Sequence, residues 1–470
     1  MEEDFIVRTR FVAALGVIAL LATACGGAAS TSPAATTAPT TAPASAPAES
    51  AVPSAAAGSY LTRALAGEFK GKHVTATGPA VDADAVKMNA MFKDFTDQTG
   101  IVIDYAGTKQ FEAVISAEVD GNNAPDIADF PQPGLLASFA KGGKVMDLSK
   151  YLDMDALKAN YTQSWIDMAT MPGASGDVMA GVWERVNGKS FVWYPKKAFD
   201  AAGYKVPTTW DELTALQDQI IKDGDTPWCI GIESGAATGW PVTDWLEEFM
   251  LRTTSLQNYD DWVSHKLPFS SPEVKAAAQK VGDLFLNPKM VNGGAAGIVS
   301  TAFGDAPKAM FTDPPKCWLH RQGNFITSFF PASAKPGVDY DVFYLPGLDP
   351  QYGTPVLVAG DIWAAFTDKP EAMAVMQWFT KGEHLKSWMA AGGAIAPQKD
   401  ADPAWYGTDV ISAFIGKTIQ NASAVRFDAS DLMPGAVGSG AEWKEFTSWI
   451  SGKEDLDTAL KNIDAAWPTQ

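Results

Sequence analysis

The chain has 470 residues and a formal net charge of −19. This length allows two or three domains' worth of hydrophobic core. The acidic balance argues against a nucleic-acid partner, because no basic surface is available to displace phosphate counterions. The 16 Trp, 24 Phe and 11 Tyr residues suit carbohydrate binding, but a large mixed α/β core would account for them equally well.

The first 24 residues have the pattern of an export signal. Arg8 and Arg10 precede an apolar run over residues 11–24, which is too short to span a bilayer as a stable helix. The run ends in Leu21-Ala22-Thr23-Ala24-Cys25, which resembles a bacterial lipobox, where the signal is cut before a cysteine that then carries lipid. We predict a signal peptide over residues 1–24 and lipidation at Cys25. A plain secretory signal cut near Ala24 is the alternative.

Residues 25–58 are predicted to form a disordered tether that begins with the lipidated cysteine. Ala, Thr, Ser and Pro dominate this segment, charge is almost absent, and no periodic apolar pattern could bury a core. A lipid anchor followed by a spacer predicts a globular body at the extracellular face of the bacterial cytoplasmic membrane, or in the periplasm. Only the N-terminal lipid is expected to contact the membrane, because no later stretch has the length and apolarity of a transmembrane helix.

Two further cysteines, Cys229 and Cys317, lie in the body, and each sits beside a tryptophan. An exported protein meets an oxidising environment, so we predict a disulfide between them. Two separate buried thiols are the alternative. A zinc site is not predicted, since neither cysteine has a Cys or His neighbour at ligand spacing.

The first part of the body alternates strands and helices. Strands are expected over residues 73–77, 101–105 and 125–128, and the apolar residues between them recur at helical spacing. This β-α-β-α-β order predicts a parallel sheet with helices on both faces. Ligands of such sheets bind beyond the carboxyl ends of the strands, which makes Gly78, Thr108 and Gln132 candidates for one wall of a site.

Two later strands contain polar interruptions. Residues 182–193 form an apolar run broken at 184–190, and residues 356–366 contain Gly360-Asp361. A break of this kind inside a strand indicates a crossing between two lobes.

Several shorter elements are expected between and after these crossings. Thr209 and Glu212 have capping-box spacing and begin a helix. A strand around Cys229 and another over residues 317–325 are expected. Another helix is predicted to begin in the segment 303–311, and residues 431–441 are predicted to be a glycine-rich loop.

The segment 226–245 has the features of a pocket for a polar ligand. Small residues over 231–239 permit another molecule to approach the backbone closely. Aromatic residues flank them and offer flat faces on which a sugar ring stacks. Trp240-Pro241 opens a predicted helix, whose N-terminus supplies free N–H donors.

The order of these motifs resembles the family 1 extracellular solute-binding proteins, the maltose-binding-like receptors of ABC importers. The likeness covers residues 74–467, and several motifs are similar to the alpha-glucoside-binding branch: 126–134, 206–210, 226–245, 303–307, 320–322 and 426–434. The resemblance implies an α/β, two-lobed periplasmic-binding-protein-like fold with crossing strands between the lobes. It also implies a monomer without a cofactor that binds a glucose-containing di- or oligosaccharide between the lobes, closes, and delivers it to permease subunits powered by an ATPase.

On this layout the body divides into four segments. They are the first part of lobe 1 (59–188), the first part of lobe 2 (189–352), a return to lobe 1 (353–396) and the C-terminal helices of lobe 2 (397–470).

The resemblance places sugar contacts on loops of both lobes. Lobe 1 is expected to contribute Thr108, Phe130 and Gln132, although Thr108 would serve equally as a helix cap. Candidates elsewhere are Trp240, Arg321, Gln322, Gly360, Asp361 and Trp443.

Three of these candidates have a structural alternative. Arg321 would otherwise pair with Asp305 or another carboxylate. Trp443 lies at core spacing with Phe446 and Ile450, and Gly360-Asp361 would otherwise only carry the crossing. Trp245 is expected in the core.

A secreted glycoside hydrolase is the main alternative class, and a surface carbohydrate-binding adhesion module is another. Hydrolysis needs two carboxylates at a fixed separation, one of them with a raised pKa. Asp244, Glu247 and Glu248 are close in sequence, but we expect them to form a solvated helix face. Glu233 stands where a Gly-x-Ser-x-Gly nucleophile motif needs its serine, and no catalytic or metal spacing involves the four histidines. We therefore expect a receptor and not an enzyme, with no metal.

Overall fold

A computed structural model describes residues 59–407 and 409–468. The predictions for residues 1–24, for lipidation at Cys25 and for the tether therefore lie outside the described residues. The α-helices are α1 (Tyr60–Leu65), α2 (Asp82–Thr99), α3 (Phe111–Asp120), α4 (Pro133–Lys141), α5 (Met154–Asn160), α6 (Gln163–Ala169), α7 (Lys196–Ala201), α8 (Trp210–Lys222), α9 (Trp240–Thr253), α10 (Leu256–Val263), α11 (Pro272–Phe285), α12 (Gly294–Ser300), α13 (Pro370–Phe379), α14 (Lys386–Ala391), α15 (Val410–Gln420), α16 (Ala429–Leu432), α17 (Trp443–Ile450) and α18 (Leu456–Ala465).

The strands form three sheets. Their bounds are β1 (His73–Gly78), β2 (Val102–Gly107), β3 (Ile127–Phe130), β4 (Thr170–Gly173), β5 (Gly176–Met179), β6 (Val182–Gly188), β7 (Phe191–Tyr194), β8 (His320–Arg321), β9 (Asp341–Tyr344), β10 (Pro355–Ala365) and β11 (Ala424–Phe427).

The largest sheet has the order β11-β10-β3-β1-β2, with β6 also paired to β10. β1 runs parallel to both β2 and β3, as the β-α-β-α-β pattern predicts. Helix α2 buries Met88, Met91, Phe92 and Phe95 against this sheet, which is the helical spacing seen in the sequence. Because these three strands are parallel, their carboxyl ends meet at one edge of the sheet.

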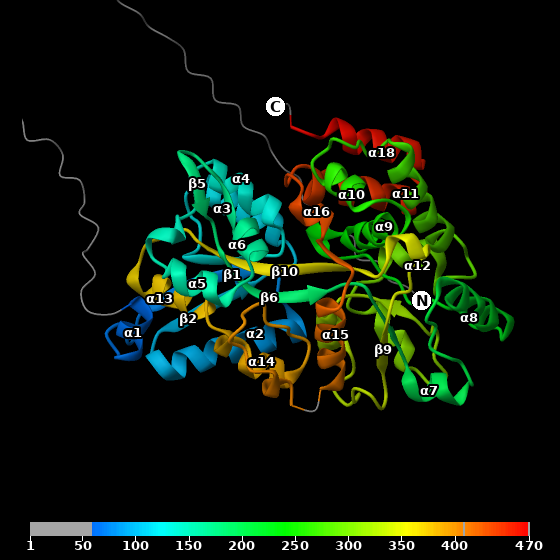
Figure 1. The fold of residues 1–470 in the computed structure, drawn as a ribbon, viewed down its shortest axis with the longest axis horizontal. Helices are drawn as coiled ribbons and strands as arrows, with labels where there is room; N and C mark the ends of the chain where they lie inside the picture. Colours follow the sequence, from blue (N-terminus) through cyan, green and yellow to red (C-terminus); the bar gives the residue numbers. More distant parts are fainter. Residues whose placement is uncertain (1–58, 408, 469–470) are drawn as a thin grey trace, which may run out of the picture. The chain divides into compact units, whose positions relative to one another are not determined.

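β10 and β6 lie side by side and run between two groups of helices (Figure 1). Every residue of both strands is buried, including the polar ones that break the apolar pattern. β10 pairs antiparallel with β6 and β3, and its first residues pair parallel with β11. The polar interruptions therefore lie inside continuous strands and do not end them.

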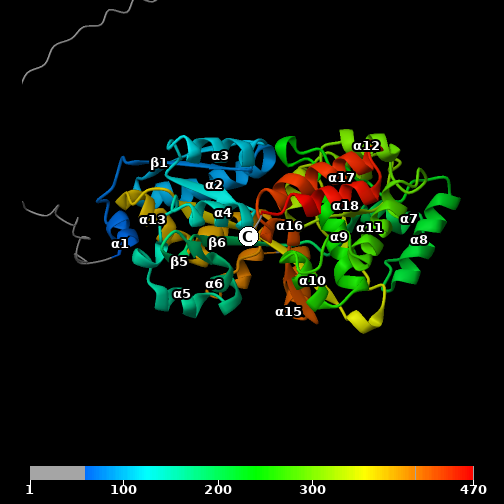
Figure 2. The same ribbon diagram turned by 90° about the horizontal axis from the view of Figure 1, so that it is seen from above.

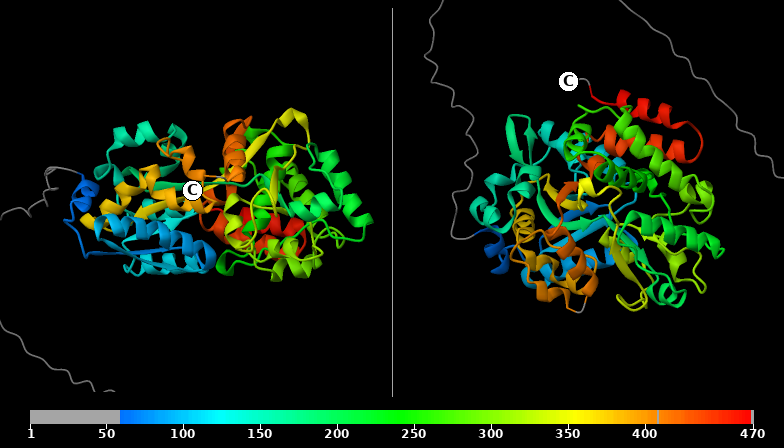
Figure 3. Two further views of the ribbon diagram at one scale, coloured as in Figure 1. Left: turned by 90° about the horizontal axis from the view of Figure 1, so that it is seen from below. Right: turned by 45° about the vertical axis from the view of Figure 1, so that its right-hand side comes forward.

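A second group of elements surrounds the small sheet β8-β7-β9. Its hydrophobic core is built largely from α8, α9, α10, α11, α17 and α18. These helices gather on one side, while α1 to α6 and α13 gather on the other (Figures 2 and 3). The described body is thus a mixed α/β structure with two groups of elements, in line with the predicted fold class.

The chain connects the large sheet to the second group at three places that contact one another. The turn between β6 and β7 is held to β10, because the Lys189 backbone N–H donates to the Leu357 carbonyl (2.8 Å) and Leu357 N–H donates to Ser190 Oγ (2.8 Å). The turn after β11 joins them through Asp428 N–H, which donates to the Val358 carbonyl (2.8 Å). The predicted lobe boundaries remain predictions; β11, which follows residue 397, extends the large sheet.

A disulfide joins Cys229 to Cys317, which confirms the predicted pairing. Other local expectations were wrong. The segment around Cys229 makes isolated bridges rather than a strand, and β8 has only two residues. The predicted loop over 431–441 contains the end of α16 and most of a π-helix, Val437–Glu442.

A helix was expected to begin in the segment 303–311, and a 3₁₀-helix forms there, Ala306–Phe311. Across the described ranges, no helix combines the length and apolarity that crossing a membrane requires.

Candidate functional site

A cavity of about 160 Å³ opens beyond the carboxyl ends of β1, β2 and β3. Pro79 follows β1, Thr108 follows β2, and Pro131 and Gln132 follow β3 at this edge. The volume has room for on the order of ten water molecules, which is far more than an ion needs. The cavity is therefore suited to a small organic molecule.

One wall of the cavity is polar and is carried by the large sheet and its helices. Arg185 on β6 donates from Nε to Asp361 Oδ2 on β10 (2.6 Å), and its Nη2 lies 3.6 Å from Asp84 Oδ2 on α2. Asn187 Nδ2 donates to the same Asp361 oxygen (3.0 Å). The guanidinium also stacks on Trp388, 4.1 Å from the ring centroid, so this wall is held rigidly.

A second wall of the cavity is aromatic. Trp240 packs edge-on against Phe303, with centroids 5.2 Å apart, and lies 6.0 Å from Phe325. Phe329 and Trp443 complete the apolar lining.

Gly239 explains how this wall is assembled. A Cβ there would meet the Trp443 carbonyl oxygen at 2.3 Å, and its φ of 116° favours glycine. The predicted close approach in this segment is therefore real, but the group that approaches is another part of the chain.

Three buried polar atoms on cavity-lining side chains have no hydrogen-bond partner among the described residues: Gln132 Oε1, Arg185 Nη1 and Trp443 Nε1. Unpaired buried donors and acceptors are costly, so native proteins satisfy them with solvent or a ligand. Their side chains line the cavity, but other protein atoms cover these three atoms, so a ligand reaches them only if the lining adjusts. A molecule with hydroxyl groups and an apolar face fits both walls.

The structure brings six of the sequence-derived candidates to this cavity. They are Thr108, Gln132, Trp240, Gly360, Asp361 and Trp443. Thr108 Oγ1 also accepts from Gln110 N–H (3.1 Å), but the residue at the cap of α3 is Gln110, so Thr108 shapes the turn before the helix and does not cap it. Gly360 is tightly packed, since a Cβ there would lie 2.8 Å from the Arg185 carbonyl oxygen.

The other four candidates, Gly78, Phe130, Arg321 and Gln322, lie outside the cavity lining. At Gly78 a Cβ would meet Asp129 Cβ at 2.8 Å. Phe130 is fully buried between Phe111 and Phe139. Gln322 accepts from Gly323 N–H through its side chain (2.8 Å), and its carbonyl accepts from Trp193 Nε1 (2.8 Å). Neither side chain is directed at the cavity by these contacts.

Arg321 has the structural role considered as its alternative, because it pairs with carboxylates, although not with Asp305. Its Nη1 donates to Asp244 (3.0 Å) and its Nη2 donates to Glu248 (3.0 Å), with all three side chains fully buried. Trp245 is buried in the core, as expected.

The expectation that Asp244, Glu247 and Glu248 form a solvated face is wrong. All three are fully buried on α9, which has core contacts around its whole circumference. Arg321 and Arg252 neutralise Glu248, while Lys189 and Arg321 neutralise Asp244.

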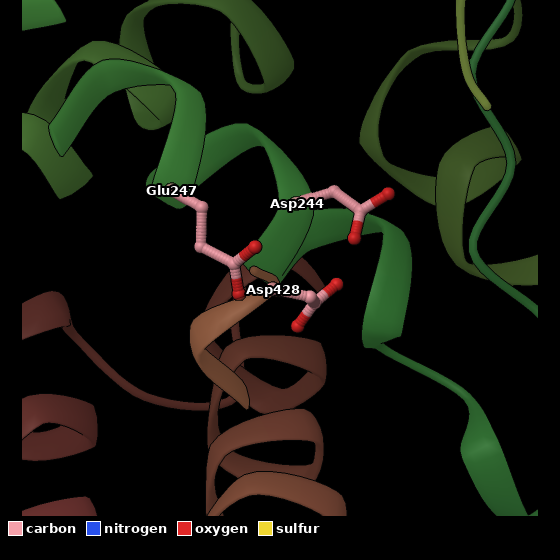
Figure 4. Close-up of side chains that lie close together, drawn as sticks. All are labelled: Asp244, Glu247 and Asp428. Atoms are coloured by element: carbon pink, nitrogen blue, oxygen red, sulfur yellow. The ribbon is translucent and has the colours of Figure 1, made fainter. Parts of the chain in front are cut away.

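Three carboxylates in this region lie close together: Asp244, Glu247 and Asp428 (Figure 4). One oxygen from each lies within 4.8 Å of the others. Lys189 Nζ, however, already contacts Asp244 Oδ1 (2.8 Å) and Asp428 Oδ2 (2.5 Å). An ammonium group thus supplies the positive charge that a metal ion would bring, and we assign no metal to these carboxylates.

Sequence reasoning missed several cavity residues, namely Asp84, Glu112, Arg185, Asn187, Lys189, Asp428, Ser430 and Asp431. The polar interruption at 184–190 was the available signal for three of them. It was interpreted only as a crossing, although the polar residues in that crossing strand and turn are directed into the site.

Burial shifts the pKa values of the cavity carboxyls. It raises the pKa of Asp84, against the opposing effect of Arg185, and it raises the pKa of Glu112. The pKa of Asp431 is raised well above its usual range by burial and by the charge of Asp428. Burial thus opposes ionisation of all three cavity carboxyls, and for Asp84 the charge of Arg185 acts against it.

This geometry defines a ligand-binding protein of the two-lobed α/β class, with a cavity that has one polar and one aromatic wall. A family model described as bacterial extracellular solute-binding protein matches residues 81–383. The chain belongs to this family.

Two relatives match over most of their length. The osmoprotective compounds-binding protein GgtB of Synechocystis sp. is 42% identical over 402 residues, covering 86% of this chain and 94% of the relative. The alpha-glucosides-binding periplasmic protein AglE of Rhizobium meliloti is 38% identical over 405 residues, covering 85% of this chain and 88% of the relative.

Solved structures share the fold at low sequence identity. The bacterial solute receptor AcbH, whose structure is described with a preference for β-D-galactopyranose, superposes with a TM-score of 0.71 at 18% identity, covering 84% of this chain and 98% of that one. Maltose-bound MalE3 of T. maritima gives a TM-score of 0.65 at 17% identity, covering 84% and 98%.

Proposed function

We propose that the protein is the extracellular receptor of a carbohydrate ABC importer and binds an alpha-glucoside, a di- or oligosaccharide, in this cavity. The main observation in favour of this function is that the cavity has one polar wall and one aromatic wall. Polar side chains of Gln132, Arg185 and Asp361 on the lining suit the hydroxyl edge of a sugar, and Trp240 offers a ring for its apolar face. The identity to the alpha-glucosides-binding relative supports this ligand class.

The remaining parts of the proposal follow from the same role. Sugar binding stabilises a form in which both walls contact it, and that form docks on two permease subunits served by a cytoplasmic ATPase. The protein acts as a monomer, is anchored through lipidated Cys25 after removal of residues 1–24, and carries out no catalysis.

Calorimetric titration of the body from residue 57 onward tests the function. The panel is trehalose, sucrose, maltose, palatinose and glucose. We expect saturable binding of at least one glucoside with a Kd in the micromolar range or below, about −8 kcal/mol, and no product on chromatography afterwards. Absence of binding to every member would reject the ligand class, and product formation would reject the receptor assignment.

Trp240→Ala tests the site itself. Loss of the stacking ring should weaken binding by about tenfold or more, since a stacked aromatic contact contributes on the order of 1 kcal/mol beyond its buried area. Trp405→Ala is the matched control, because Trp405 is half-buried and lies outside the cavity lining. Equal affinities for the two variants would remove Trp240 from the site.

A further inference from the structure

Lys189 lies beside the cavity, where the three connections between the large sheet and the second group of elements contact one another. It lies in the turn between β6 and β7, and only 6% of its side chain is exposed. Its Nζ contacts Asp244 on α9 and Asp428 after β11, and it faces the Trp240 ring 5.1 Å from the centroid. Lys189, Trp240 and Asp428 all line the cavity. One side chain thus joins the crossing segments to the aromatic wall.

Asp428 connects Lys189 to Ser430 and Asp431, which we call the floor residues of the cavity. While Oδ2 binds Lys189, Oδ1 accepts from Ser430 Oγ (2.8 Å) and from Asp431 N–H (3.0 Å), which caps α16. Ser430 and Asp431 both line the cavity. Any displacement of Asp428 would therefore move two cavity residues together.

Glu247 is the unusual member of the group. Its Oε1 accepts from Ser430 N–H (3.0 Å), but its Oε2 has no partner among the described residues, although the side chain is fully buried. The carboxyl group is directed toward Asp428 (Figure 4). Two ionised carboxylates this close in a dry interior repel each other, so such pairs hold a shared proton.

The surrounding charges favour a proton on Glu247 rather than on Asp428. Burial and the charges of Asp428 and Asp244 raise the pKa of Glu247 well above its usual range. Burial opposes ionisation of Asp428 as well, but the positive charge of Lys189 holds the pKa of Asp428 below its usual range. The titratable and charged groups that face Glu247 or its partners are Lys189, Asp244, Glu248, Arg252, Tyr259, Arg321, Asp428, Asp431 and Glu442.

We propose that Lys189 is a positioning residue for the binding cavity, and that Glu247 supports it as a neutral carboxylic acid whose hydroxyl donates to Asp428. This inference rests on the proposed function. When Glu247 loses its proton, its charge repels Asp428 and competes for Lys189. The floor residues and Trp240 then lose the positions that suit the sugar, and affinity falls as the pH rises. Since the protonated form binds better, sugar binding takes up a proton in that pH range.

Glu247→Gln tests the inference, because the amide keeps an acceptor for Ser430 N–H and a donor for Asp428 but cannot ionise. The affinity of whichever panel glucoside the wild type binds is measured by calorimetry from about pH 5 to about pH 9 in buffers of different ionisation enthalpy. We expect the wild-type affinity to fall by about tenfold per pH unit beyond the pKa of Glu247, with proton uptake. The variant should show neither effect, whatever its affinity at neutral pH.

Glu442→Gln is the matched control. Glu442 is also a buried carboxyl, its pKa is raised by burial and by Asp428, and neither oxygen has a partner among the described residues. It contacts neither Ser430 nor Lys189 by hydrogen bond, so this variant should keep the fall in affinity with rising pH, shifted to lower pH because the charge of Glu442 contributes to the raised pKa of Glu247. Identical profiles for the wild type and Glu247→Gln, or a flat profile only in Glu442→Gln, would overturn the inference.

Two further measurements separate the possible failures. If no glucoside binds at any pH, the proposed function fails, and the stability of the sugar-free protein decides the inference instead. The wild type should lose stability as pH rises above about 4.5, the ordinary Glu value, toward the raised pKa of Glu247, and Glu247→Gln should lose less. An equal loss of stability with rising pH in the wild type and in Glu247→Gln would overturn the inference. Lys189→Arg should retain more affinity than Lys189→Met, because it keeps the positive charge between the two aspartates.

Discussion

Replacing Arg185 by Met should destabilise the protein far more than removing a comparable ion pair from its surface. The Arg185 side chain is 4% exposed and Asp361 is 5% exposed, with Nε and Oδ2 2.6 Å apart. Removing one member of a buried pair leaves an uncompensated charge, which costs about 3–5 kcal/mol. Asp84, Glu184 and Asp129 also interact with the guanidinium, so the loss should lie in the upper part of this range.

Arg426→Met is the matched control for this experiment. Arg426 binds Asp260 through two hydrogen bonds of 2.6 and 2.9 Å, but the two side chains are 29% and 47% exposed. An exposed pair of this kind contributes about 0–1 kcal/mol. The two variants therefore compare the same pair of residue types at two degrees of burial.

Urea unfolding of the sugar-free body provides the free energies for both variants. Adding Asp361→Asn to Arg185→Met should recover part of the loss, because it removes the unpaired charge, with a coupling of about 1–3 kcal/mol. The reasoning would be refuted if Arg185→Met cost no more than Arg426→Met, or if the second substitution added its full cost independently.

Three other outcomes are expected. Cys229→Ser removes a disulfide between residues 88 positions apart, so the entropy of the unfolded chain rises and the free energy of unfolding in urea should fall by about 4–5 kcal/mol. A fall below about 1 kcal/mol would contradict this prediction. Trp443→Phe removes an N–H that has no protein partner among the described residues. Glucoside affinity should therefore fall by about two- to tenfold in calorimetry, with little change in the free energy of unfolding. An unchanged Kd would exclude the indole from the site. Burial lowers the pKa of His320 to about 4, so the folded protein binds this proton less readily than the unfolded chain. The free energy of unfolding should therefore fall as the pH drops from about 6.5 toward 4. In thermal unfolding His320→Gln should show a smaller fall over this range, and an equal fall would argue against this assignment.

The fold was readable from the sequence where local periodicity and strand order decide the structure. The alternation of strands and helices over residues 73–130 predicted the parallel strands, and the position of Thr108 and Gln132 after those strands placed them at the cavity. Trp240 followed from a glycine-rich segment at a helix start. These inferences need only neighbouring residues and the geometry of a parallel sheet.

The charged interior was not readable in the same way. Asp244 and Glu248 have a polar pattern that suits a solvated helix, and only distant residues make their burial possible. Arg321 lies 77 positions from Asp244, and Lys189 lies 239 positions from Asp428. A single sequence does not show which of its many carboxylates meet these cations. The same ion pairs explain why Arg321 lies outside the cavity lining.

The separation of the two cavity walls bears on how the ligand specificity of this protein changes during evolution. The polar wall stands on the large sheet and α2, through Asp84, Arg185 and Asp361, whereas the rings come from α9, α17 and the segments near Phe303 and Phe325. Substitutions that reposition hydroxyl contacts can accumulate on the first wall while the platform for the sugar ring persists. Substitutions on the first wall would then change the hydroxyl contacts without altering the rings of the second.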